Sequence, residues 1–265
     1  MSVPARLLGR LDDLGQVLDR RGDAIALIGV GSVGQDLGRL DEHSDMDFFV
    51  VVQDAAKPQY LASVDWLEEL GPVAFSFANT PDGRKALFAD GLFAEYAVFT
   101  LAQVRAAAYT AGRVVWRRAD APDGLEEPAD GPRTVTVREG SSEQAAAAET
   151  WHVNEALTNL YVGMHRELRG ERLSAARFIQ GYAVDQVLAV LDATEPGRAP
   201  RQDVFALERG IEGRYDTDAL PLPSMVPGYE HNADAARAIL DWLESRAPVL
   251  QVDAAMAAAI RALTS

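Results

Sequence analysis

Residues 28–32, Ile-Gly-Val-Gly-Ser, and residues 44–52, Ser-Asp-Met-Asp-Phe-Phe-Val-Val-Val, decide the fold of this chain. The first stretch is an apolar run that ends in Gly31-Ser32, and the second is an apolar run that begins with Asp45 and Asp47. Alternate residues of a strand point to one face, so strand geometry would place the two carboxylates about 7 Å apart on one side. Such carboxylates repel one another unless a cation lies between them or one of them is protonated.

The Gly31-Ser32 turn offers backbone N–H groups and a hydroxyl to an anion. A phosphate-binding turn beside metal-binding carboxylates is the combination that phosphoryl transfer requires. Each part also has an ordinary interpretation. Gly31-Ser32 alone is a turn and helix cap, and Asp45 alone is an acid at the start of a strand.

Hydrophobic periodicity extends the prediction over the first half of the chain. It indicates helices at 4–20, 32–38 and 58–70, and strands at 24–30, 48–52, 73–77, 84–89 and 92–101. The turn-forming residues 79–83 join two of these strands as a hairpin. Adjacent hairpin strands without strict strand–helix alternation favour a mixed sheet with flanking helices.

Residues 119–133, rich in proline, glycine and acidic residues, predict a loop and a domain boundary. We therefore expect an α+β protein with domains at 1–130 and 131–265, the second a helical bundle. Ser141 and Gln144 fit a capping box before a long helix that ends at Gly170. Further helices are expected at 173–191, 203–209, 232–246 and 250–263.

Composition restricts the classes of partner. The 265 residues carry a formal net charge of −15, which disfavours nucleic acid and anionic membranes as partners and favours small cationic molecules. The chain has no cysteine, so disulfides and thiolate chemistry are excluded. The N-terminal residues lack a signal-type apolar segment, and no apolar run is long enough to span a bilayer, so we expect a cytoplasmic location.

The Gly-Ser turn, the twelve residues that separate it from Asp45, and the apolar run after Asp47 together resemble the signature of polymerase-beta-like nucleotidyltransferases. The chain length and two further stretches narrow this resemblance to the small-molecule antibiotic enzymes, particularly the lincosamide nucleotidyltransferases. These stretches are residues 95–99, Glu-Tyr-Ala-Val-Phe, and residues 159–172, which contain Asn-Leu-Tyr and Arg-Gly-Glu-Arg.

The resemblance implies a nucleotidyltransferase-type sheet domain and a helical domain for substrate binding and dimerisation. It also implies a two-metal Mg²⁺ site at Asp45, Asp47 and a third carboxylate from a neighbouring strand. Glu95 is the candidate, because an acid inside an apolar strand is costly to bury unless it is paired or binds a metal. Glu69, Asp82 and Asp90 remain alternatives. Gly31, Ser32 and Ser44 would hold the phosphates of the nucleotide.

The implied reaction transfers a nucleoside monophosphate, AMP from ATP or the equivalent from another nucleoside triphosphate, to a hydroxyl of a small molecule. Glu95 would be the general base, and pyrophosphate would leave. A lincosamide or an aminoglycoside is the implied acceptor, antibiotic resistance the implied role, and a homodimer the implied assembly. The alternative is a non-catalytic or protein-directed module of the same fold, resembling an antitoxin.

The sequence departs from the resembled family at the phosphate-binding turn. The family often has a basic residue soon after Gly-Ser, whereas residues 33–36 here are Val-Gly-Gln-Asp. Part of the triphosphate must therefore be held by a cation from elsewhere in the chain. The arginines at 166, 169, 172 and 177 are interpreted as a solvated face that counters nearby glutamates, with one of them a candidate for this role.

Overall fold

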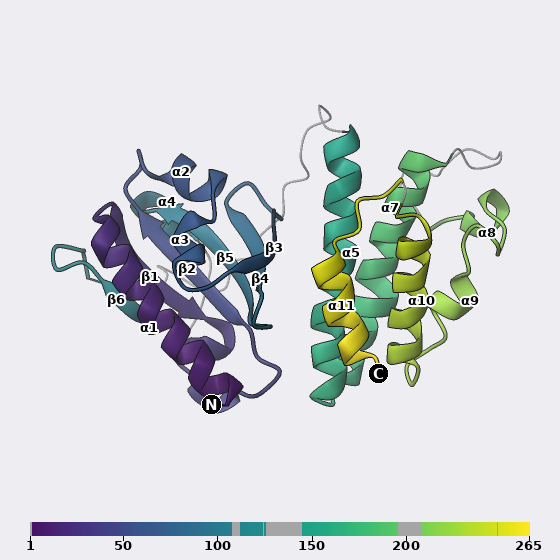
Figure 1. Ribbon diagram of the computed structural model, residues 1–265, viewed down its shortest axis with the longest axis horizontal. Helices are drawn as coiled ribbons and strands as arrows, with labels where there is room; N and C mark the ends of the chain where they lie inside the picture. Colours follow the sequence, from purple (N-terminus) through teal and green to yellow (C-terminus); the bar gives the residue numbers. More distant parts are fainter. Residues whose placement is uncertain (1, 108–111, 124, 126–144, 196–207, 248) are drawn as a thin grey trace. The chain divides into compact units, whose positions relative to one another are not determined.

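The computed structural model describes residues 2–107, 112–123, 125, 145–195, 208–247 and 249–265 (Figure 1). The chain forms two compact units, Met1–Glu139 and Gly140–Ser265. The expected boundary at 130/131, the capping box at 141–144 and most of the helix at 203–209 lie outside the described residues. The predicted α+β class is confirmed, because the first unit contains a mixed sheet and the second is helical where it is described.

The described strands of the first unit form one six-stranded sheet in the order β3-β4-β5-β2-β1-β6. Their bounds are β1 (Ala24–Val30), β2 (Met46–Val52), β3 (Val73–Ala78), β4 (Gly83–Phe88), β5 (Phe93–Thr100) and β6 (Arg113–Arg117). Strands β2 and β5 run parallel, whereas the other described neighbours pair antiparallel. The sequence patterns predicted β1 to β5, but the short edge strand β6 was not expected.

Helices cover both faces of this sheet (Figure 1). On one face lie α1 (Val3–Arg21), α2 (Lys57–Ala62) and α3 (Asp65–Glu68), and α4 (Leu101–Ala106) lies on the other. The leucines of α1 recur at helical spacing, so Leu7, Leu11, Leu14 and Leu18 are all buried against the sheet. Gly22 ends this helix in the left-handed conformation, with φ of 73°.

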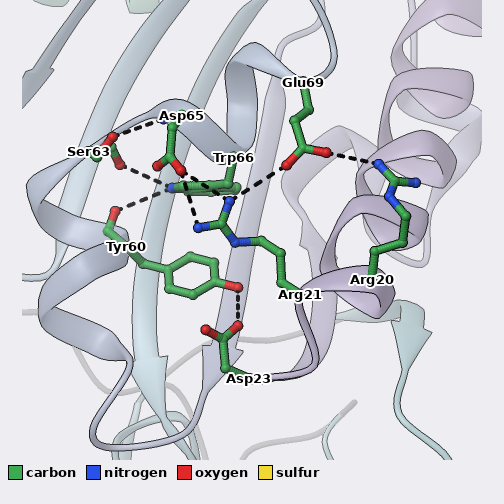
Figure 2. Close-up of polar contacts among 8 residues, drawn as sticks. All are labelled: Arg20, Arg21, Asp23, Tyr60, Ser63, Asp65, Trp66 and Glu69. Carbon is green, nitrogen blue, oxygen red and sulfur yellow. Dashed lines mark hydrogen bonds and ion pairs between the residues drawn. The ribbon is translucent and has the colours of Figure 1, made fainter.

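The single helix predicted at 58–70 is instead two short helices, α2 and α3. Ser63 between them is extended, with φ of −135° and ψ of 154°, and its hydroxyl accepts a hydrogen bond from the backbone N–H of Asp65. The indole N–H of Trp66 donates to the carbonyl oxygens of Tyr60 and Ser63 (Figure 2). A hydroxyl that accepts from the first N–H of the next helix and an indole that binds the freed carbonyls make this break favourable.

The end of α1 is attached to this broken helix by charged and polar contacts (Figure 2). The guanidinium of Arg21 donates two hydrogen bonds of 3.2 Å to Asp65 and lies 3.6 Å from Glu69. The hydroxyl of Tyr60 donates to the carboxylate of Asp23 at 2.6 Å. Tyr60 is fully buried, and this burial, with the hydrogen bond to Asp23, raises its pKa.

The second unit is built around α5 (Ala145–Leu168), which contacts most of the other described helices of the unit. The others are α6 (Arg172–Ala176), the π-helical segment η3 (Arg177–Ala183), α7 (Val184–Thr194), α8 (Ile211–Arg214), α9 (Leu222–Met225), α10 (Asn232–Ser245) and α11 (Ala254–Leu263). The expected helix at 173–191 is thus interrupted by a π-helical stretch. A Cβ at Gly163 would lie 2.5 Å from Ile179, so α5 and η3 pack closely only because residue 163 is glycine.

Among the described residues, no helix has the length and apolar character needed to cross a membrane.

Candidate functional site

Strand β1 ends in a tight turn that only glycine allows. Gly31 has a φ of 59°, and the N–H of Gly34 donates to its carbonyl at 3.2 Å to close the 3₁₀ turn η1 (Gly31–Val33). A Cβ at Gly29 would lie 2.6 Å from the carbonyl oxygen of Val33, and a Cβ at Gly31 would lie 2.5 Å from Oδ2 of Asp47. The turn therefore folds back onto the end of β1 and brings its backbone against the Asp47 carboxylate.

The prediction of a single helix at 32–38 is wrong. The chain forms η1 and a second 3₁₀ turn, η2 (Leu37–Arg39), and Gly34 between them has a ψ of −142° that no helix allows. The glycines at 34 and 38 lower the helix propensity of so short a segment, so single turns form instead.

Strand register brings Asp47 and Glu95 together. Asp47 pairs with Val30 across β1–β2 and with Glu95 across the parallel β2–β5 pair. Glu95 in turn pairs with Lys85 on β4. Register partners point to the same face, and neighbouring strands are about 4.8 Å apart. The two carboxylates and the lysine therefore form a row across three strands, with the Gly31 turn at its end.

Asp45 does not lie in the strand, contrary to the sequence-based expectation. Strand β2 begins at Met46, and a turn over residues 41–44 delivers Asp45 to it. In this turn the carboxylate of Asp41 accepts from the N–H of His43 at 2.8 Å and from the hydroxyl of Ser44 at 3.2 Å. The turn keeps Asp45 out of the pleat, so the 7 Å spacing deduced from strand geometry does not apply. The Ser44 hydroxyl, which was expected to contact phosphate, donates its hydrogen bond within this turn to Asp41.

Glu95 is held from the neighbouring hairpin. The side-chain amide of Asn79, next to the β3–β4 turn, donates to Oε1 of Glu95 at 3.0 Å. Lys85 is 8% exposed, and its Nζ lies 6.0 Å from the ring centroid of Phe77. Lys85 was missed in the sequence, although the signal that identified Glu95, a charge inside an apolar strand, is present in residues 84–88 as well.

Strand β6 contributes a second cation. Arg113 pairs with Gly29, and its Nε donates to the carbonyl oxygen of Val33 at 3.0 Å. The side-chain amide of Gln35 donates to the carbonyl of Gly112 at 3.0 Å, a second link between the turn and the start of β6. Within the described part of the chain, Nη2 of Arg113 and Oγ of Ser32 are buried atoms that have no hydrogen-bond partner.

The three carboxylates expected to bind metal are not a ready-made cluster. No group of three or more His, Asp, Glu or Cys residues in the described ranges is arranged to hold a metal ion. Mg²⁺, however, is usually bound by one or two carboxylates together with substrate phosphates. Asp47 and Glu95, side by side in register, supply hard oxygen donors of that kind, and the donor set fits such an ion.

The arginines of the helical unit have ordinary partners. Arg166 and Arg169 lie 2.9 and 3.5 Å from Glu171. Arg172 lies 3.6 Å from Glu167. For these three residues, the interpretation as a face that counters nearby glutamates is confirmed.

No protein-family model matches this chain, and no curated protein matches it. Among solved structures, the crystal structure of an aminoglycoside 6-adenyltransferase from Bacillus subtilis is similar to it over 96% of this chain and 89% of that one. The two share 11% sequence identity with a TM-score of 0.30.

Proposed function

We propose that this chain is a Mg²⁺-dependent nucleotidyltransferase that transfers AMP from ATP to a hydroxyl of a small molecule. The observation that carries the proposal is the row of Asp47, Glu95 and Lys85 across three interior strands of the sheet, with the Gly31 turn close to Asp47. Carboxylates for metal and base, beside a backbone turn that can approach phosphates closely, are the parts that in-line phosphoryl transfer needs.

Each residue has a role in this scheme. Asp45 and Asp47 would hold Mg²⁺, which when bound neutralises charge on the triphosphate. Glu95, oriented by the amide of Asn79, takes the proton of the acceptor hydroxyl. The hydroxyl oxygen then bonds to the α-phosphorus while the bond from that phosphorus to the pyrophosphate oxygen breaks, and pyrophosphate carries the electrons away.

The acceptor, the location and the assembly belong to the same proposal. The net charge of −15 attracts cationic acceptors, which supports an aminoglycoside or a lincosamide. We assign acceptor binding and dimerisation to the helical unit, place the enzyme in the cytoplasm and expect antibiotic resistance as its role.

The test is incubation of the purified protein with ATP labelled at the α-phosphate, Mg²⁺, and a panel of aminoglycosides and lincosamides. We expect label on an acceptor and release of pyrophosphate. Glu95→Gln should reduce transfer about 100-fold or more, because a positioned base alone contributes that much. Asp47→Asn should also reduce transfer strongly, because the Mg²⁺ site loses a carboxylate. The control is Asp12→Asn, which neutralises an exposed acid on α1.

Two results would contradict this proposal. One is the lack of pyrophosphate release with every acceptor together with the lack of ATP binding by calorimetry. The other is labelled AMP that stays on protein bands in a denaturing gel, which supports the protein-directed alternative.

A further inference from the structure

A nucleoside triphosphate carries several negative charges, and the turn that would hold it has no cation of its own. Residues 33–36 supply none, and the next basic residue, Arg39, is exposed. A phosphate site normally combines backbone N–H groups with at least one cationic side chain. The cation must therefore come from another element that reaches the turn.

Strand β6 reaches the turn because it runs antiparallel to β1. Its first residue, Arg113, therefore lies beside the end of β1, in register with Gly29. The Nε of Arg113 donates to the carbonyl oxygen of Val33, in the turn itself, at 3.0 Å. The hydrogen bond from Nε therefore fixes the orientation of the Arg113 guanidinium against the turn.

The rest of that guanidinium is not satisfied. Its Nη2 is buried without a hydrogen-bond partner among the described residues, and so is Oγ of Ser32, the residue that precedes Val33 in the turn. Buried polar atoms are nearly always paired, and those that are not deserve an explanation. Two unpaired donors associated with one turn match the phosphate oxygens of a nucleotide, which accept from guanidinium and hydroxyl groups alike.

We propose that Arg113 is the cation that binds the triphosphate, in place of the basic residue missing after Gly31-Ser32. Nε holds the turn through Val33, while Nη2 and the Ser32 hydroxyl donate to phosphate oxygens. This inference rests on the proposed function. If Arg113 only stabilised the turn, its replacement would weaken the binding of every nucleotide alike. If it binds phosphate, its replacement weakens the binding of a nucleotide more strongly the more phosphates that nucleotide carries.

The experiment measures dissociation constants of the Mg²⁺ complexes of ATP, ADP, AMP and tripolyphosphate by calorimetry. Arg113→Met should weaken ATP and tripolyphosphate about 10-fold or more, the effect of a lost charge-assisted hydrogen bond, and AMP less than about 2-fold. Arg113→Lys, which keeps the charge, should recover part of the loss. The control is Arg117→Met, on the same strand, whose guanidinium pairs with exposed Asp123 at 2.7 Å.

The outcomes separate this inference from the proposed function. If the unaltered protein binds ATP and Arg113→Met binds it equally well, or loses ATP and AMP to the same extent, Arg113 is not a phosphate ligand. If the unaltered protein binds neither ATP nor tripolyphosphate, the nucleotidyltransferase proposal fails first. Should Arg113→Met fold poorly in thermal unfolding, Arg113→Lys and Ser32→Ala give the same comparison between ATP and AMP.

Discussion

At the scale of the residue, Gly31 is the position where the backbone comes close to a candidate metal-binding carboxylate, that of Asp47. Its φ of 59° disfavours any other residue, and a Cβ would lie 2.5 Å from the Asp47 carboxylate. We expect Gly31→Ala to lower the free energy of unfolding by about 1–3 kcal/mol. We also expect it to reduce AMP transfer at least about 10-fold, because the carboxylate must shift.

Urea denaturation and the labelled-ATP assay measure both effects of Gly31→Ala. Gly9→Ala is the matched control, since Gly9 lies in α1 with open space around its Cα and alanine favours helix there. Activity as high in Gly31→Ala as in Gly9→Ala would show that the turn does not need to approach Asp47.

Asn79 is a positioning residue in this scheme, because it acts through the 3.0 Å hydrogen bond to Glu95. Asn79→Ala should lower kcat about 5- to 30-fold, as the loss of one hydrogen bond of about 1–2 kcal/mol does, and leave KM for ATP unchanged. Steady-state kinetics in the Glu95→Gln background are decisive. In that background Asn79→Ala should cause no further loss of kcat. A further loss as large as in the unaltered protein would mean that Asn79 does not act through Glu95.

Sequence reasoning reached some of these residues and missed others for a physical reason. Asp47 and Glu95 could be found because a carboxylate inside an apolar run is costly unless it has a function. The positions of Lys85 beside Glu95 and of Arg113 beside the Gly31 turn depend on which strand lies beside which. Strand order and register arise from contacts between distant segments, which local patterns do not encode.

At the scale of the element, the attachment of α1 to the α2–α3 break determines a pH-dependent part of the stability. The pKa of Tyr60 is raised by burial first and by its hydrogen bond to Asp23 second. Since the unfolded tyrosine has a pKa of about 10, the neutral phenol contributes full stability below that pH. This contribution is lost as the pH rises above 10, because the unfolded chain then binds fewer protons than the folded one.

Tyr60→Phe should therefore reduce the free energy of unfolding by about 1–2 kcal/mol at neutral pH, since the carboxylate of Asp23 loses its donor. It should also flatten the fall in stability above pH 10. Chemical denaturation between about pH 7 and about pH 11 measures both. Tyr182→Phe, at an exposed tyrosine of η3, is the control. An alkaline fall as steep in Tyr60→Phe as in the unaltered protein would rule out this residue as its source.

The elements themselves were predictable to different extents. Long periodic segments such as α1, α5 and α10, and the apolar strands, follow from hydrophobic spacing alone. The break at Ser63 and the π-helical stretch in residues 177–183 do not. At the break the Trp66 indole donates to the carbonyl of Ser63, and in the π-helical stretch Ile179 packs closely against Gly163 of α5, and hydrophobic spacing encodes neither contact. Strand β6 is a short edge strand, where β-propensity is a weak guide.

At the scale of the whole molecule, the net charge of −15 acts on every approaching ligand. A polycationic aminoglycoside should be attracted, and this attraction is screened by salt. We expect KM for such an acceptor to rise several-fold between about 0.05 M and about 0.5 M salt, with kcat little changed. Initial rates at several ionic strengths measure this. An acceptor with a single positive charge provides the comparison, and equal salt dependence for both acceptors would contradict long-range attraction.

The parallel pairing of β2 with β5 has a consequence for how relatives of this chain should be identified. Asp47 meets Glu95 through register, and a shift of one residue would turn Glu95 to the opposite face while leaving a parallel ladder intact. The site should therefore tolerate many substitutions in these strands but no single-residue insertion or deletion between Asp47 and Glu95 that changes the pairing. In a family alignment, gaps should be confined to the intervening loops, and the positions of those gaps would be more informative than percentage identity.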